Sequence, residues 1–182
     1  IALKEILNRF NLEIFDVENT KTHGGSNRYF IKDKLNNNFK IKNNVKKEIA
    51  KEIKFGLHKF STYKKFAIKV KNSKKKLLDI FDKLKKKKSR IIGYGATAKS
   101  CTVLNYCGLD VKDIEYFVDT TSYKIGKYLP GSKILIKKYK KLKTGNIDAI
   151  FLGAWNFKDE IFKKEKEFIR KGGKFITHIP TP

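Results

Sequence analysis

The order of apolar and polar positions first predicts a small helix-and-hairpin segment in residues 1–32. Apolar side chains recur at helical spacing over residues 1–10, and residues 12–18 then alternate apolar with acidic. A glycine-containing loop leads to a second apolar run at residues 29–31, which indicates two strands joined by that loop. Two strands and one helix bury too little apolar surface to fold alone, so we expect the end of a preceding domain.

The pattern changes in residues 33–89, which we interpret as a linker and a helical connector. The run KDKLNNNFKIKNN, residues 32–44, is polar and rich in asparagine, as linkers are. Apolar positions at helical spacing resume at about residues 45–60 and about residues 61–88.

From Arg90 onward, strand-like and helix-like runs alternate. The strand-like runs are IIGYG, IEYFVD, KILI, IDAIFLGAW and GKFITHIP, and helical patterns end near Tyr106 and cover Asp159 to Arg170. Such alternation is typical of a mostly parallel sheet with helices on both faces. We therefore predict a Rossmann-like, three-layer α/β domain in residues 90–182.

The net charge of the chain suggests one alternative function. The 182 residues carry 43 lysines and arginines and a formal net charge of +25, which suits a nucleic-acid-binding protein. Only four of these residues are arginine, whereas base readout and bidentate phosphate contacts favour arginine. Because the lysines alternate with apolar residues throughout, we interpret most of them as the solvated faces of helices.

Composition also limits the cellular setting and the chemistry. No run approaches the roughly 20 apolar residues of a membrane helix and no signal peptide is evident, so we expect a cytoplasmic protein. The chain begins with Ile1 and contains no methionine, from which we expect the C-terminal part of a longer protein. Cys101 and Cys107 lack metal or redox spacing and the three histidines are scattered, so no metal site is predicted.

The stretch RIIGYGATAKS holds the first candidate site. Its pattern, Gly93-x-Gly95-x-x-Ala98, follows a predicted strand and precedes a helix that starts near Thr97. Free N–H groups and the helix dipole favour an anion there, and Lys99 adds a positive charge. We predict that the substrate-binding residues of this loop are Gly93, Gly95, Ala96, Ala98 and Lys99. The alternative is a compact strand-to-helix turn without a ligand.

Asp119 is the next candidate, because it ends the run IEYFVD 21 residues after Ala98. At this spacing a dinucleotide-binding fold places an acidic residue that accepts hydrogen bonds from ribose hydroxyls. Asp119 is therefore a predicted substrate-binding residue, or else it caps a loop. The same two features would suit an NAD(P)-binding module of an oxidoreductase.

Four further residues complete the predicted site. Trp155 and Asn156 follow the run IDAIFLGA, at the carboxyl edge where open parallel sheets bind ligands. Trp155 either lines the sugar pocket or only packs, and Asn156 also suits the N-cap of a helix. Arg28 suits a diphosphate contact, or a pair with Glu13 across the two strands. His23, in a glycine-flanked turn, suits a proton-transfer or hydroxyl-binding role, or faces solvent.

Five runs, in order, resemble a known family: THGGSNRYFI, GYGATAKSCTVLNYCGL, FVDTTSYKIGKYLPGSKILI, AWNFKDEI and GGKFITHIP. They are similar to the C-terminal portion of sugar C-methyltransferases, which use S-adenosylmethionine to methylate a carbon of a nucleotide-linked deoxysugar. The resemblance covers about Leu12 to Pro180.

The resemblance implies that residues 1–32 are the tail of an N-terminal methyltransferase domain and that residues 90–182 hold the sugar nucleotide, most commonly a dTDP-sugar. It places most of the S-adenosylmethionine site and the catalytic base upstream of Ile1, with His23 the one weak candidate here. The isolated chain is then expected to be inactive without its N-terminal methyltransferase domain.

Overall fold

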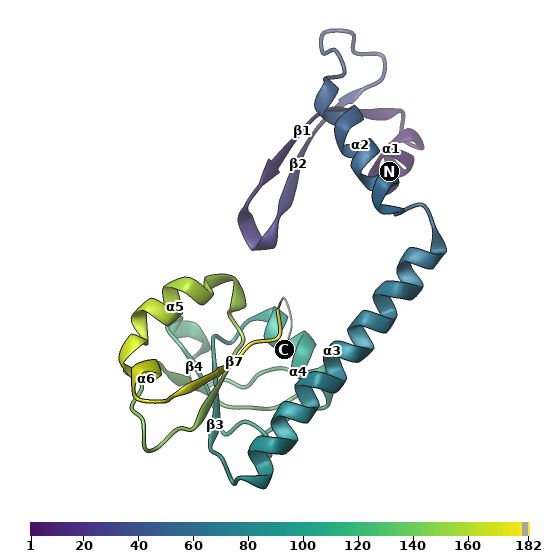
Figure 1. Cartoon of the computed structure of the whole chain (residues 1–182). Helices are drawn as coiled ribbons and strands as arrows, with labels where there is room; N and C mark the ends of the chain where they lie inside the picture. The colour runs from purple at the N-terminus through teal and green to yellow at the C-terminus, as the bar shows by residue number, and fades with distance from the viewer. Residues whose placement is uncertain (180–181) are drawn as a thin grey trace. The chain divides into compact units, whose positions relative to one another are not determined.

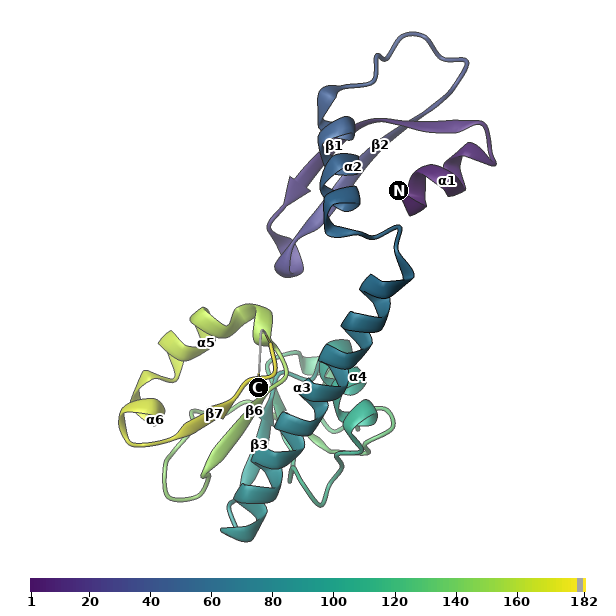
Figure 2. The same cartoon turned by 45° about the vertical axis from the view of Figure 1, so that its right-hand side comes forward.

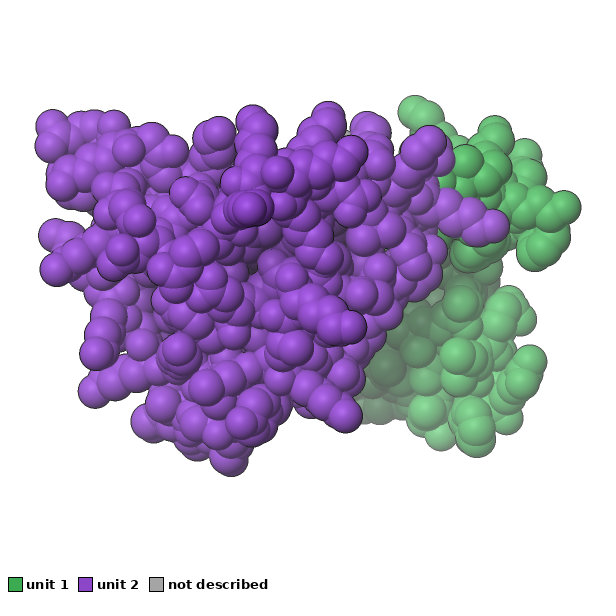
Figure 3. Space-filling model, turned by 90° about the horizontal axis from the view of Figure 1, so that it is seen from below, with its two compact units in different colours: residues 1–69 green, residues 70–182 purple. Residues whose placement is uncertain are grey.

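The computed structural model describes residues 1–179 and 182, apart from the side chain of His23. It divides into two compact units, Ile1–Lys69 and Val70–Pro182 (Figures 1 and 3). Pro180, the last residue of the run GKFITHIP, lies outside the described residues. The three-part division expected from the sequence, at residues 32 and 89, stays a prediction.

The first unit is a two-stranded antiparallel hairpin with two helices. Helix α1 (Ala2–Asn8) precedes strand β1 (Leu12–Thr20), a short 3₁₀ turn η1 (Thr22–Gly24) leads to β2 (Ser26–Asp33), and α2 (Asn43–Phe55) follows. The predicted helix and pair of strands are therefore present. A bulge between Ile14 and Asp16 shifts the register, so the alternation along β1 is broken.

The segment predicted as a linker lies partly against β1. The ring of Phe39 stacks on that of Phe15, with centroids 4.8 Å apart. The main-chain amide of Lys42 donates to the carbonyl of Phe15 (2.8 Å), and the Lys42 ammonium pairs with the buried Asp16 carboxylate at 2.6 Å. The asparagine-rich composition concealed these contacts because they involve only a few side chains.

The second unit is built on a five-stranded parallel sheet. Its strands are β3 (Ile91–Tyr94), β4 (Phe117–Asp119), β5 (Ile136–Lys138), β6 (Ala149–Leu152) and β7 (Lys174–Ile176), in the spatial order β5-β4-β3-β6-β7. The sequence order reverses between β3 and β6, as in doubly wound nucleotide-binding folds. Between β4 and β5 lies a 3₁₀ turn, η2 (Ser122–Lys124).

Helices cover both faces of this sheet, which confirms the predicted three-layer α/β class (Figure 2). On one face, Leu77 and Phe81 of α3 (Phe60–Lys86) and Leu104 of α4 (Ala98–Cys107) pack in one apolar cluster with Phe117 and Phe151. On the other face, α5 (Lys158–Lys164) and α6 (Lys166–Arg170) cover a second cluster. Because the strands are buried on both faces of the sheet, their sequences are nearly continuous apolar runs.

The helix predicted over Asp159–Arg170 is interrupted at Glu165. This residue is only 2% exposed, and its carboxylate accepts a hydrogen bond from the Tyr139 hydroxyl at 2.6 Å. Helical hydrogen bonds continue across the interruption, from Glu165 N to Ile161 O and from Ile169 N to Glu165 O. The prediction of one continuous helix was therefore wrong at the inward-facing Glu165. Among the described residues, no helix has both the length and the apolar character that a membrane span requires.

Gly93 offers a test of the packing under the sheet. A Cβ atom at this position would lie 2.3 Å from the Phe117 ring, and Phe117 is fully buried. Gly93→Ala is therefore expected to lower the free energy of unfolding by about 1–3 kcal/mol through overpacking, measured by urea denaturation. The double variant with Phe117→Leu frees space and should recover part of the loss. Equal stabilities of Gly93→Ala and wild type would contradict this packing.

Candidate functional site

The candidate site lies at the carboxyl edge of the five-stranded sheet. Tyr94 of β3 pairs with Leu152 of β6 and with Val118 of β4, so the loops after these strands leave the sheet side by side. The break in strand order between β3 and β6 is where open α/β sheets place their ligands. Gly93 lies within β3 itself, and its absent side chain makes room for the Phe117 ring rather than for a ligand.

The loop after β3 and the loop after β6 are packed tightly together. An added Cβ at Gly95 would lie 2.4 Å from the Ala154 Cβ, and Gly95 has a φ of +83°, so both space and conformation require glycine. The Thr97 hydroxyl donates to the carbonyl of Gly153 at 3.2 Å. The loops after β3 and β6 therefore contact each other directly.

Helix α4 begins at this edge as predicted. Thr97 is its N-cap: the Thr97 hydroxyl accepts from the Ser100 amide, and the Ser100 hydroxyl accepts from the Thr97 amide at 2.9 Å. This reciprocal pair is a capping box with serine at the third helical position. The buried Ser100 is a structural residue that the glycine pattern did not reveal.

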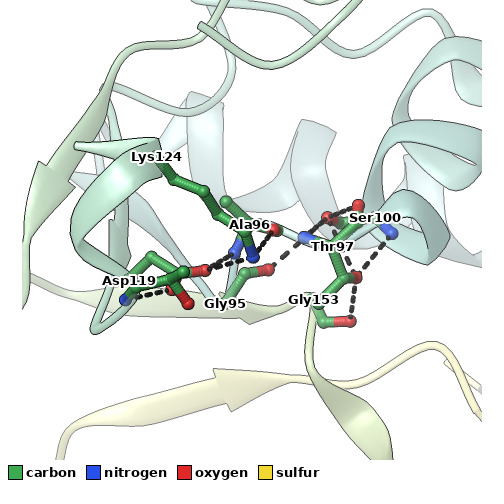
Figure 4. Close-up of polar contacts among 8 residues, drawn as sticks. Gly95, Ala96, Thr97, Ser100, Asp119, Lys124 and Gly153 are labelled. Atoms are coloured by element: carbon green, nitrogen blue, oxygen red, sulfur yellow. Dashed lines mark hydrogen bonds and ion pairs between the residues drawn. The ribbon is translucent and has the colours of Figure 1, made fainter. Parts of the chain in front are cut away.

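The protein itself occupies most of the loop amides that the sequence made available to an anion (Figure 4). Gly95 N donates to Val118 O and Ala96 N to the Asp119 carboxylate, each at 2.8 Å, while Thr97 N is used by the capping box. Among the described residues, no acceptor is found for the amides of Ala98 and Lys99. The loop amides left without an acceptor are therefore those of the first turn of α4, fewer than the sequence predicted, and anion binding there stays a prediction.

The Asp119 carboxylate ties the neighbouring loops together. It accepts hydrogen bonds from the amides of Ala96 and Thr121, both at 2.8 Å, and pairs with the Lys124 ammonium at 3.3 Å (Figure 4). Lys124 also donates to the carbonyl of Ala96 at 2.8 Å. These contacts support the loop-capping interpretation of Asp119, while its ribose contact stays a prediction.

The pKa of Asp119 reflects these partners. Burial by itself raises the pKa of this carboxyl, which is 7% exposed. Hydrogen bonds from Thr121 and Ala96 and the charge of Lys124 outweigh burial, so the pKa of Asp119 lies below its ordinary value. The carboxylate is therefore charged at neutral pH.

Lys99 and Trp155 come together at the edge. The Lys99 ammonium lies 5.9 Å from the centre of the Trp155 ring, and both side chains are half-buried. Trp155 begins a 3₁₀ turn, η3 (Trp155–Phe157), directly after β6 and its short loop. The first turn of α4 therefore carries a lysine whose ammonium lies beside the Trp155 ring.

Asn156 lies inside η3 and is not a helix cap. The residue before α5 is Phe157, and no side-chain hydrogen bond caps that helix, so the predicted N-cap role of Asn156 was wrong. A 3₁₀ turn intervenes between strand and helix, which the sequence pattern did not show. The Asn156 Oδ1 atom is buried and has no partner among the described residues.

Arg28 and His23 belong to the first unit. Arg28 pairs with Glu18, its cross-strand neighbour, at 3.4 Å, and not with Glu13, whose partner is Lys32 at 3.0 Å. The bulge in β1 and the hairpin register determine this pairing. Both charges of the Arg28 pair are largely exposed, so the pair adds little stability and its diphosphate role stays a prediction. The side chain of His23 lies outside the described residues.

The first unit also contains a cavity of about 550 Å³ that the sequence motifs did not indicate. Apolar residues of β1 and α2, such as Val17 and Val45, line much of it. None of the predicted site residues contributes to its wall. No group of three metal-ligating side chains occurs among the described residues, and Cys101 and Cys107 are free thiols.

Replacing Asp119 with alanine tests how strongly the loops depend on its carboxylate. Asp119→Ala leaves the buried Ala96 amide without its acceptor, so we expect the free energy of unfolding at pH 7 to fall by about 1–3 kcal/mol. Because the pKa of Asp119 is lowered in the folded state, the carboxylate's contribution to the free energy of unfolding is present above about pH 4 and is lost as the pH falls further. Urea unfolding at pH 7 and pH 3 should show the gap between wild type and variant closing. A gap that is unchanged at pH 3 would contradict a charged-carboxylate role.

The sequence of this chain is similar to those of known proteins. A family model described as the C-methyltransferase C-terminal domain matches residues 21–180. The chain is also 32% identical over 181 residues to the C-methyltransferase NovU of Streptomyces niveus, an alignment that covers all of this chain and 43% of that relative. The chain thus spans less than half the length of the relative. It carries the parallel sheet, the glycine loop and the capped helix described above, and it belongs to the C-methyltransferase C-terminal domain family.

Proposed function

We propose that this chain is the C-terminal part of an S-adenosylmethionine-dependent enzyme that methylates a carbon of a nucleotide-linked sugar, and that residues 70–182 hold the sugar nucleotide. The observation that carries the proposal is the first turn of α4, where the Ala98 and Lys99 amides have no described acceptor. Family membership supports the methyl-transfer class.

The electrostatics of this turn favour a phosphate. Free N–H groups at a helix N-terminus carry partial positive charge, and an anion there is stabilised by both hydrogen bonds and the helix dipole. Lys99 lies in this same turn, where a cation opposes the dipole unless an anion is bound. A diphosphate relieves that conflict, which is why we assign it to this position.

The same chemistry does not suit S-adenosylmethionine. Its reactive centre is a positively charged sulfonium and it carries no phosphate, whereas the site offers a lysine and two amide donors. The Asp119 carboxylate beside this turn is committed to Ala96, Thr121 and Lys124. We therefore place the methyl-donor site and the catalytic base outside residues 70–182.

The contribution of residues 70–182 to the reaction is then positioning. Binding energy gained at the nucleotide, far from the reacting carbon, can orient the sugar for attack. Lys99 and the Ala98 and Lys99 amides would bind the phosphates, and Trp155 would line the position beside them. The fixed loops, held by Asp119, keep these groups in place without reorganisation on binding.

We further propose that residues 1–32 complete the cofactor domain of the full-length enzyme. Both β1 and β2 have an unpaired edge, since they form a two-stranded sheet. Large apolar side chains of this unit, including Phe10, Ile31 and Phe55, are exposed. A neighbouring domain would cover such a surface.

A ligand titration of the 182-residue chain tests the phosphate site. We expect dTDP to bind, and Lys99→Ala to weaken this binding about tenfold or more, since a charge-assisted contact contributes about 1.5–3 kcal/mol. Lys112→Ala is the matched control, because Lys112 is an exposed lysine in the turn after the opposite end of α4. Isothermal titration calorimetry at constant salt measures both.

Three results would contradict the proposal. Equal losses in Lys99→Ala and Lys112→Ala would show that dTDP senses only the general positive charge. Tighter binding of NAD than of dTDP would favour the oxidoreductase module. Sequence-dependent binding of a DNA or RNA duplex would favour the nucleic-acid alternative.

A further inference from the structure

Two buried polar atoms at the carboxyl edge lack hydrogen-bond partners among the described residues: Asn156 Oδ1 and His178 Nδ1. Asn156 lies in the turn after β6, and His178 follows the neighbouring strand β7. Buried polar atoms in folded proteins are nearly always bonded, so these two atoms indicate hydrogen-bond partners that the described residues do not supply. A third such atom, Ser132 Oγ, lies between β4 and β5.

His178 lies on the face of the sheet that α3 and α4 cover. Ile176 pairs with Phe151, and both belong to the apolar cluster on that face. His178 is two residues beyond Ile176, so its side chain faces the same way. The imidazole stacks on the Phe151 ring, with centroids 5.3 Å apart and planes 13° apart, and His178 is only 4% exposed.

The loop after β6, the strand that pairs with β7, contacts the first turn of α4. Gly153 and His178 each lie two residues beyond Phe151 and Ile176, the last residues at which β6 and β7 pair. A Cβ on Gly153 would meet the carbonyl of Gly95 at 2.4 Å and the Ser100 Cβ at 2.9 Å. The strand beside His178 therefore touches both the glycine loop and α4, and the imidazole lies one strand further along this edge.

We propose that His178 is a ligand-binding residue whose imidazole, together with the Asn156 amide, hydrogen-bonds hydroxyl groups of the sugar of the bound nucleotide sugar. This inference rests on the proposed function, because it assumes that the phosphates lie on the adjacent first turn of α4. It gives the two parts of the ligand different partners: charge and amides for the diphosphate, neutral side chains for the sugar.

The chemistry of the two side chains matches a hydroxyl group. Burial lowers the pKa of His178 below its ordinary value, so the ring is neutral at pH 7 and offers one donor and one acceptor. A primary amide likewise offers both. A hydroxyl donates and accepts, whereas a phosphate accepts only and is better bound by a cation.

A comparison of two ligands isolates the sugar contact. With the 182-residue chain, we expect His178→Phe to weaken dTDP-glucose binding about fivefold to tenfold, the effect of one lost neutral hydrogen bond. Binding of dTDP, which lacks the sugar, should stay within about twofold. His178→Asn is the second variant, because a phenylalanine ring is larger than an imidazole and can disturb the stack on Phe151. It should also weaken the binding of dTDP-glucose and not that of dTDP, by a smaller factor. His58→Phe, at an exposed histidine of residues 1–69, is the control and should change neither affinity.

Nuclear magnetic resonance of the unmodified protein gives a readout that a purely structural role would not move. The chain has three histidines, so single substitutions assign the ring resonances. The His178 Nδ1 resonance should shift with dTDP-glucose and not with dTDP.

The outcomes separate the two proposals. Equal losses for both ligands, no loss, or an unmoved His178 resonance during dTDP-glucose binding would overturn the sugar contact while leaving the phosphate site intact. Failure of the wild-type chain to bind either ligand would overturn the proposed function itself, and the sugar contact with it.

Discussion

The Asp119 carboxylate determines the shape of the whole candidate site. It joins the end of β4 to the loop after β3 through Ala96 and to the following turn through Thr121, and Lys124 closes the set. A charged group at 7% exposure is stable only with such partners. Because three of the loop amides are bonded within the protein, the chain presents a defined pair of donors at Ala98 and Lys99 instead of a flexible row.

The packing of the loops at the sheet edge connects the fold to the candidate site. The strand order reverses between β3 and β6, and the loops that follow these strands pack closely through Gly95, Gly153 and Ala154. Under the proposed function, a ligand at this edge would contact the first turn of α4, which carries Lys99. Gly95 and Gly153 allow the two loops to approach each other closely. In this structure that is a packing role, and it does not require a phosphate.

The sequence predicted the architecture well because the signals are local. Continuous apolar runs mark the buried strands β3 and β6, and the cap Thr97 marks the start of α4. The α/β class and the family follow from such features. The interruption at Glu165 did not, because it involves a contact between distant segments, that of Tyr139 with Glu165. The turn η3 was not predicted either, since the pattern there suited a helix start at Asn156.

The site was predictable only in part, for the same reason. The glycine pattern located the loop, yet it could not show that Ala96 donates to Asp119, since that bond joins residues 23 positions apart. His178 lies in the family-like run GGKFITHIP, but nothing in that run marked it as a site residue, and only the pairing of β7 with β6 brings it to the site's edge. Parallel sheets create this difficulty generally, because the loops that meet at one edge are separated in the chain by whole helices. In such folds, burial and pairing together identify the polar atoms that the described residues leave unsatisfied, which a sequence motif does not show.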